Sequence, residues 1–231
     1  MEFLEQTEKD RNDVKKAVVH FIHIGKTGGT SIKEALKNHL VVKEYLIRLH
    51  NHNFKLRDVP LGDKAFFFLR DPLQRFVSSF YSRQRQGMPR YMRPWSYGEA
   101  IAFNLFSTAN QLAEALRSDD INYQNSAVEA MQSIQHVKNS FFDWIETEEY
   151  FRQRLNDVLL IGFQDDMESD FNKLKELLGL PAELILPDDD IKAHRNPAVV
   201  DKYLSSAAKS NLTNWYQKDI QFYNICKHKS I

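Results

Sequence analysis

Short apolar runs alternate with stretches of helical spacing along this chain. Three runs are rich in β-branched or aromatic residues, as is typical of buried strands; they cover residues 17–24, 65–69 and 158–163. Apolar residues at helical spacing follow each run, at residues 31–40, 72–81 and 166–178. Strands that are apolar throughout and alternate with helices favour a parallel sheet with helices on both faces. The expected fold class is therefore α/β.

Residues that favour helix ends support these boundaries. Ser31 and Glu34 have the spacing of a capping box, which predicts a helix start close to Ser31. Pro72 suits the first turn of the second helix. Gly179 is typical of the position that follows a helix, and Pro181 lies just beyond it.

The rest of the sequence is mainly helical and contains no linker that would separate two domains. Residues 85–157 are expected to form a helical insert that shapes a substrate cleft, with the clearest helical pattern at 98–117. Two further helical patterns lie near residues 199–210 and 212–223. We therefore expect a single domain over residues 1–231, in which residues 1–16 are a charged N-terminal extension.

Charge and composition exclude several classes of protein. Lys+Arg and Asp+Glu both total 31, so a bulk attraction to nucleic acid or to an anionic membrane is not expected, and any anion site must be local. The single cysteine, Cys226, cannot form a disulfide within the chain, which fits a reducing compartment. The N-terminus has no apolar signal segment, and the apolar runs are too short to span a bilayer. These features predict a soluble, cytoplasmic protein.

A glycine-rich segment joins the first expected strand to the first expected helix. It consists of Gly25, Lys26, Thr27, Gly28, Gly29, Thr30 and Ser31. Glycines let several backbone N–H groups converge on one anion, and a helix start adds partial positive charge. Lys26 adds a full charge and the three hydroxyls add donors, so this segment is expected to bind a phosphate or sulfate group.

The segment differs from the Walker A loop of nucleotide-binding proteins. Residues 25–27 match the end of that motif, but its opening glycine is replaced by His20, inside the expected strand. Gly28 and Gly29 instead follow the lysine. A P-loop nucleotide kinase or NTPase would also need an acidic Mg²⁺ ligand at a strand end, and it stays open as an alternative. A non-catalytic nucleotide-binding module is the other alternative.

A second anion site is expected where the second strand ends. Arg70 lies at that end, on the edge of an open α/β sheet where ligands bind. Ser78 follows two helical turns later, so its hydroxyl can approach the same anion. Two anion sites at neighbouring strand ends suggest a ligand with phosphates at both ends.

Together these two segments resemble the cofactor motifs of sulfotransferases that use 3'-phosphoadenosine 5'-phosphosulfate (PAPS). Residues 23–31 (HIGKTGGTS) are similar to the loop that binds the 5'-phosphosulfate, and residues 70–81 (RDPLQRFVSSFY) to the 3'-phosphate motif. The nearest likeness is to the carbohydrate branch that includes the heparan uronyl sulfotransferases. The resemblance implies a P-loop-like three-layer fold, with a central, mostly parallel sheet flanked by helices. Weaker similarities lie at residues 161–167, 194–197 and 216–223.

The resemblance implies a role for each matching residue. Lys26 would contact the phosphosulfate and stabilise the leaving phosphate, and the rest of the glycine segment would surround the 5'-phosphate. Arg70 and Ser78 would hold the 3'-phosphate. Asp71 and Arg75 would be structural, as an ion pair that fixes the helix start. Two residues of a late loop would close over the cofactor; they are Arg195 and Asn196.

Transfer to a hydroxyl also calls for a base that removes the acceptor proton. His50 and His52 lie between the two cofactor motifs, where uronyl sulfotransferases carry a similar His-x-His segment, and histidine has a suitable pKa. The spacing does not choose between them. His20 and His23, in the first expected strand, are more typical of buried structural histidines. No convincing metal-ligand spacing occurs, and no metal is expected.

A basic and aromatic stretch follows Arg70. Its arginines and aromatic residues are Arg70, Arg75, Arg83, Arg85, Arg90, Arg93, Tyr81, Tyr91, Trp95 and Tyr97. Aromatic faces stack on sugars and arginines pair with carboxylate or sulfate, so the expected acceptor is a glycan or another anionic hydroxyl compound. The alternative is that several of these arginines pair within the chain, with Glu99, Asp119 or Asp120.

Overall fold

The computed structural model describes residues 16–189, 191 and 201–228. Its sheet has four strands, and all their pairings are parallel, in the order β2-β1-β3-β4. The strands are β1 (Ala17–Phe21), β2 (Tyr45–Leu49), β3 (Lys64–Leu69) and β4 (Val158–Phe163). The expected α/β class and parallel sheet are confirmed. The strand β2 was not predicted, and β1 ends three residues earlier than its apolar run.

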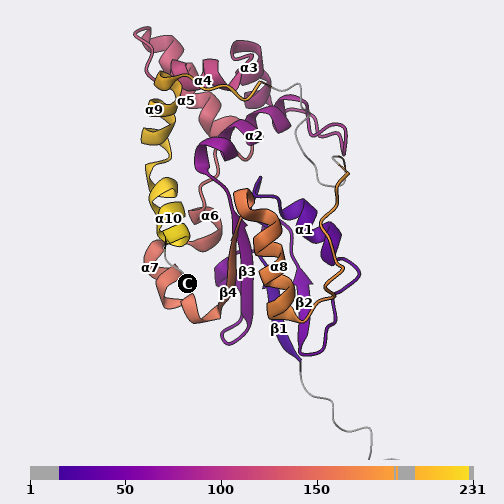
Figure 1. The fold of residues 1–231 in the computed structure, drawn as a ribbon. Coiled ribbons are helices and arrows are strands. Elements are labelled where there is room, and N and C mark those ends of the chain that lie inside the picture. The colour runs from indigo at the N-terminus through magenta and orange to yellow at the C-terminus, as the bar shows by residue number, and fades with distance from the viewer. Residues whose placement is uncertain (1–15, 190, 192–200, 229–231) are drawn as a thin grey trace, which may run out of the picture.

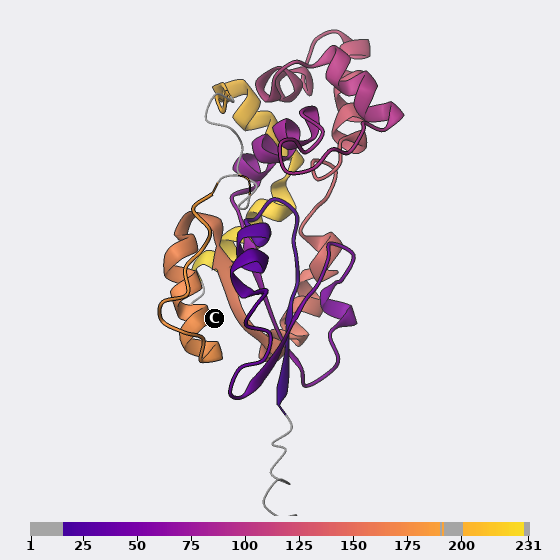
Figure 2. The ribbon, with the colours of Figure 1, turned by 90° about the vertical axis from the view of Figure 1, so that its right-hand side faces the viewer.

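Helices cover both faces of this sheet, which makes the expected three layers (Figure 2). One face packs on α1 (Gly29–Leu36) and α8 (Met167–Leu178) through apolar residues such as Ile32 and Phe171. The other face packs on α6 (Phe142–Ile145), α7 (Glu148–Gln153) and α10 (Gln217–His228). Phe66 and Phe67, adjacent in β3, belong to opposite faces. This two-sided burial explains why the strands are continuous apolar runs.

The order of the strands places a switch point at the ends of β1 and β3. From β1 the chain passes through α1 to β2 on one side, and then crosses to β3 on the other side of β1. Ligands of open α/β sheets bind at such a switch point, beyond the carboxyl ends of the strands. Here the glycine segment follows β1 and Arg70 follows β3, so both expected anion sites lie at this one place.

A second group of helices lies beyond that edge of the sheet (Figure 1). It is built from α2 (Pro72–Gln84), α3 (Tyr97–Leu105), α4 (Ala109–Ala115), α5 (Ile121–Ser133) and α9 (Ser206–Trp215). Phe76, Phe80, Phe106 and Leu212 are among the residues of its apolar core. The sheet's edge and this helical group together frame the space in front of the glycine segment.

Some of the expected helix boundaries are confirmed and others are wrong. The first helix begins at Gly29, close to Ser31 as expected, but its cap is Gly28 and the expected capping box of Ser31 with Glu34 does not form. The stretch 98–117 is two helices, because Thr108 caps a new one. The C-terminal patterns are also displaced: α9 begins after its cap Ser205, and α10 continues to His228. The end of α8 at Gly179 is confirmed.

Within the described residues, no helix combines the length and the apolar character that crossing a membrane requires.

Candidate active site

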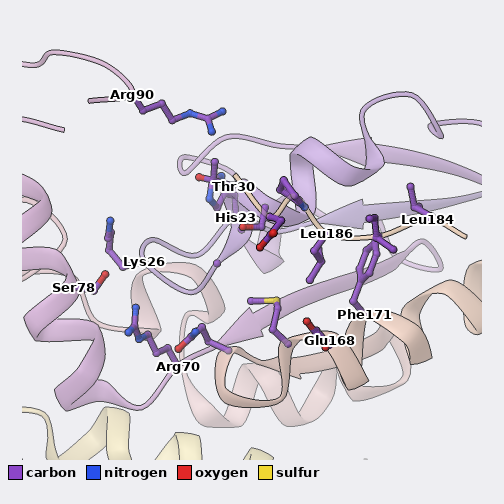
Figure 3. A pocket seen from close by; sticks show the side chains of 18 of the residues that line it. His23, Lys26, Thr30, Arg70, Ser78, Arg90, Glu168, Phe171, Leu184 and Leu186 are labelled. Carbon is purple, nitrogen blue, oxygen red and sulfur yellow. The ribbon is translucent and has the colours of Figure 1, made fainter. Parts of the chain in front are cut away.

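One cavity of about 810 Å³ brings most of the candidate residues together (Figure 3). Its lining includes Lys26, Gly28, Gly29, Thr30, Ser31, His52, Arg70 and Ser78. These residues come from four separate segments, which the switch point of the sheet collects. Gly25, Thr27 and His50 are not part of the lining, and Arg195 and Asn196 lie outside the described residues.

The glycine segment is shaped by side chains that pack closely against it. Gly28 caps α1 with a φ of 87°, a left-handed conformation that a glycine adopts without strain. At Gly25 an added Cβ would lie 2.7 Å from Nδ1 of His136, so only glycine allows this approach. The Thr27 hydroxyl donates to the Ile24 carbonyl (3.0 Å), which fixes the segment internally instead of facing the cavity.

Arg70 and Ser78 face the same cavity from β3 and α2. The Arg70 guanidinium is largely desolvated, which lowers its pKa, and its buried Nε has no hydrogen-bond partner among the described residues. A buried donor without a partner is costly. In Figure 3, Lys26, Ser78 and Arg70 lie near one another. This arrangement suits an anion that supplies the missing acceptors.

Asp71 and Arg75 do not form the expected ion pair. The carboxylate of Asp71 caps α2 by accepting from the Gln74 amide (2.9 Å). Arg75 instead donates through Nε to the Gly25 carbonyl (2.9 Å) and through Nη1 to the Asn139 carbonyl (2.7 Å). Both residues are structural, as expected, but Arg75 acts by fixing the glycine segment to α2.

Lys26 has an unusual electrostatic environment. Desolvation, followed by the positive charges of Arg85 and Arg70, lowers the pKa of Lys26 to about 7. Its φ of 68° is left-handed, which a lysine adopts only at a cost in free energy. An anion beside this ammonium group would favour its charged form. The fraction of Lys26 that is charged at neutral pH therefore depends on whether an anion is bound beside it.

His52 is oriented as a proton acceptor. Its Nδ1 lies 2.8 Å from the His23 carbonyl, which can only accept, so Nδ1 carries the hydrogen and Nε2 keeps its lone pair. The Trp144 indole donates to the His52 carbonyl (2.8 Å) and fixes the backbone there. Burial lowers the pKa of His52, so the ring is neutral at neutral pH. This is the protonation state that a general base needs.

His50 points elsewhere. Its Nε2 lies 2.9 Å from Nδ1 of His20, and Nε2 of His20 lies 3.1 Å from Asp63. The His50 ring also stacks on Phe54, with centroids 3.5 Å apart. Burial and then the neighbouring His20 lower the pKa of His50 to about 4. The geometry thus separates the two candidates, with His52 in the cavity wall and His50 in a structural network.

The other two candidate histidines are buried, as expected. His20 is 5% exposed and His23 is 8% exposed. His23 nevertheless lies beyond the end of β1 and lines the cavity, with its ring 4.0 Å from that of His52. Burial, followed by the charge of His52, lowers the pKa of His23 to about 2. It is therefore a neutral wall of the site as well as a core residue.

The basic and aromatic stretch divides into structural and cavity residues. Arg83 forms a buried ion pair with Glu99 (2.7 Å), one of the pairings that the alternative interpretation named. Asp120 caps α5 and has no such pairing among the described residues. Arg90 and Tyr91 line the cavity together with Arg70. A local cationic and aromatic wall thus exists, although it is smaller than the sequence suggested.

Sequence reasoning missed a set of residues that the fold brings to the cavity from the helical group, from α8 and from the segment that follows α8. They are His136, Gln164, Met167, Glu168, Phe171, Asn172, Lys175, Leu184, Ile185, Leu186, Pro187, Asp188 and Lys202. Phe171 and Met167 occupy the helix face that amphipathic spacing assigned to packing, so the pattern carried no signal of a site. His136 is isolated in the sequence, without a motif around it.

This arrangement is suited to a ligand with two separate anionic groups and to removal of a proton from a third group. Lys26 with the start of α1 is one candidate anion site, Arg70 with Ser78 is the other, and His52 is a neutral imidazole in the cavity wall. Among the described residues, no three acidic, histidine or cysteine side chains converge as metal ligands would.

Residues 12–225 match the family model described as "Sulfotransferase family", a match that spans nearly the whole chain and both candidate anion sites. No curated protein matches the sequence at a significant level.

Proposed function

The chain belongs to the sulfotransferase family, and from this premise we propose that it transfers the sulfuryl group of PAPS to a hydroxyl of a carbohydrate or another anionic acceptor. The observation that carries the proposal is one cavity with two cationic anion sites at neighbouring strand ends. A donor with a 5'-phosphosulfate and a 3'-phosphate has the matching distribution of charge.

The residues present fit such a donor. The buried Nε of Arg70 lacks an acceptor among the described residues, and the pKa of Lys26 is lowered because its charge is desolvated and next to other cations. Both features are relieved when phosphate groups bind. At the start of α1 no side chain of the capping residue Gly28 bonds the first backbone N–H groups, which suits a helix start that binds an anion.

We assign the groups of the donor to parts of the cavity as follows. Lys26, Thr30 and Ser31 would hold the 5'-phosphosulfate end, and Arg70 with Ser78 would hold the 3'-phosphate. Apolar side chains further along the cavity would accept the flat adenine ring; they are Met167, Phe171, Leu184, Leu186 and Pro187. Each assignment follows from matching charge to charge and apolar surface to apolar surface.

The mechanism follows from the chain's own groups. When bound, PAPS supplies an activated sulfuryl group and a phosphate leaving group. Nε2 of His52 accepts the proton of the acceptor hydroxyl, because its Nδ1 is committed to the His23 carbonyl. Lys26 places positive charge where the phosphate leaves. The proton thus ends on His52, and the charge that develops on the phosphate is balanced by the glycine segment.

Acceptor recognition is assigned to the wall formed by Arg90, Tyr91 and Lys202. Cations pair with carboxylate or sulfate groups, and an aromatic face stacks on a sugar ring. An acidic oligosaccharide is therefore expected to be a better acceptor than a neutral phenol. A phenol that outperforms acidic oligosaccharides would contradict this part of the proposal.

Calorimetric titration and a transfer assay test the proposed function. The protein should bind desulfated PAPS (PAP) without metal, and bind ATP weakly whether or not Mg²⁺ is present. His52→Ala should bind PAP like the parent but lose roughly 10²–10⁴-fold in turnover, whereas His50→Ala, the matched control, should lose only a few-fold. Absence of PAP binding, or Mg²⁺-dependent ATP binding in its place, would overturn the proposal. Equal losses in the two histidine variants would reject the assigned base alone.

A further inference from the structure

His136 is a cavity residue whose position no sequence motif explains. It lies between α5 and α6, yet its side chain lines the cavity beside the glycine segment. Only 9% of the residue is exposed, and neither ring nitrogen has a hydrogen-bond partner among the described residues. The ring is nine-tenths buried and faces the cavity, so its nitrogens can form hydrogen bonds with a group that binds there.

The backbone at His136 is strained. Its φ of 67° is left-handed, a conformation that costs free energy for residues other than glycine. Such strain persists only where the surroundings impose it, and it concentrates at functional sites. Lys26, in the glycine segment, shares this property with a φ of 68°.

Buried side chains from other elements impose that conformation. Four of them hold the backbone on both sides of His136. The contacts are Glu99 to the Gln135 amide (3.1 Å), Tyr216 to the Val137 carbonyl (2.7 Å), Arg75 to the Asn139 carbonyl (2.7 Å) and Asp219 to the Phe141 amide. Each of the four donor or acceptor residues is at most 5% exposed. The loop is thus fixed from the helical group and from the C-terminal helices at once.

The ring lies between the two parts of the site that carry chemistry. Its Nδ1 packs on Gly25, where a Cβ would lie only 2.7 Å away, and its centroid is 5.4 Å from that of His52, edge to face. Burial, followed by the charges of Lys26 and His52, lowers its pKa well below the usual range. At neutral pH the ring is therefore uncharged and keeps one N–H donor.

We propose that His136 is a further catalytic residue, which donates its ring N–H to an oxygen of the transferring sulfuryl group. The sulfur must pass between the phosphate at Lys26 and the acceptor at His52, and His136 packs against both places. Its hydrogen stays on the ring, so no bond at His136 forms or breaks. This inference rests on the proposed function, and it gives the sulfuryl oxygens a hydrogen-bond donor in addition to those of the glycine segment.

Two substitutions separate the ring from the backbone. His136→Gly removes the donor and accepts a positive φ without strain. His136→Asn also tolerates that conformation and keeps a side-chain N–H. We expect the glycine variant to bind PAP like the parent, to bind PAPS about tenfold more weakly, and to lose about 100-fold in kcat. The asparagine variant should recover part of both losses.

Every other pattern would overturn the assignment. An unchanged ratio of PAPS to PAP affinity with normal kcat in His136→Gly would show that the ring does not meet the sulfuryl group. Equal losses for PAP and PAPS would indicate a structural role, and a raised acceptor KM with unchanged PAPS affinity would place His136 on the acceptor.

The parent protein keeps the test decisive if the variants do not fold. In protein labelled with ¹⁵N at its histidine rings, PAPS should shift the signal of His136, identified by its contact with Gly25, and PAP should leave that signal in place. No difference between PAPS and PAP at any histidine signal would reject the inference. A parent that binds PAP and transfers sulfate confines any failure to His136, whereas a parent that does neither removes the proposed function itself.

Discussion

An arginine is buried near each end of α2, but among the described residues only one of the two forms an ion pair with a carboxylate. At the far end, Arg83 is 1% exposed and donates to both carboxylate oxygens of Glu99 (2.7 and 2.8 Å). At the near end, Arg70 is desolvated and its Nε has no partner among the described residues. Both guanidinium groups are removed from water. Arg83 gains a carboxylate in place of the water, whereas the Nε of Arg70 gains no hydrogen-bond partner among the described residues.

The difference separates scaffold from binding site. Burial alone would raise the pKa of Glu99, but hydrogen bonds from Arg83 and from the amides of Ser96 and Gln135 hold it at about 2. That pair is complete and has no need of a ligand. At the glycine end, desolvation and then the charges of Arg85 and Arg70 lower the pKa of Lys26, and desolvation lowers the pKa of Arg70 despite Asp165 and Asp71. Interactions that these cations do not make within the folded protein can form with a ligand and contribute to its affinity.

The largest effect is expected at the complete pair. Arg83→Ala leaves the Glu99 carboxylate buried without its partner, which should destabilise the fold by about 3–5 kcal/mol. Denaturant unfolding monitored by circular dichroism measures this loss. Replacing both residues with apolar ones, Arg83→Met with Glu99→Leu, should restore most of the stability. A single variant as stable as the parent would mean that the pair is not the structural element described here.

The opposite outcome is expected at Arg70. Arg70→Ala should weaken PAP binding about 100-fold, since charge-assisted hydrogen bonds to phosphate are lost, while the thermal midpoint of the ligand-free protein stays the same or rises. Arg70→Lys should fall between, because an ammonium group cannot bind in a bidentate manner. Arg57→Ala, which removes an exposed surface arginine, is the control for charge alone. If Arg70→Ala lost stability and kept its PAP affinity, Arg70 would be a structural residue like Arg83.

The sequence predicted the parts of the fold and site whose signals are local. The β3 run and the end of α8 are set by a few neighbouring residues, and so is the glycine segment between a strand and a helix. The strand β2 was missed because YLIRL is short and only one of its residues is fully buried, so its apolar pattern is weak. The cap of the first helix was assigned to Ser31 because the residue that caps it, Gly28, has no side chain and so gives no capping signal in the sequence.

Contacts between distant segments carried no such signal. Nothing near Arg75 in the sequence announces that it binds the Gly25 carbonyl, 50 residues away. The choice between His50 and His52 likewise depends on which ring the His23 carbonyl and the His20 ring engage. His136 reaches the cavity from the segment between α5 and α6, more than 100 residues along the chain from the glycine segment. Contacts of this kind depend on how the strands and helices are connected and packed, and the residues near each contact in the sequence do not reveal them.

The smallest effect is expected in the pH dependence of binding, and it tests whether Lys26 belongs with Arg70 in the comparison. The pKa of Lys26 is about 7 in the ligand-free protein, and a phosphate beside it raises that pKa. Binding therefore takes up a proton above pH 7, and PAP affinity should fall by up to about tenfold per pH unit as pH rises from 7. Calorimetry in buffers with different ionisation enthalpies measures the proton uptake directly.

Lys26→Arg separates the lysine from the phosphates of PAP, which titrate in the same experiment. A guanidinium group stays charged across this range, so the variant should keep binding PAP while the decline between pH 7 and 9 disappears. Lys26→Met should bind weakly at every pH and take up no proton. If the PAP affinities of the parent and of Lys26→Arg instead fall in parallel as pH rises, Lys26 is charged even without a ligand. Arg70 is then the one residue of this site to which the comparison applies.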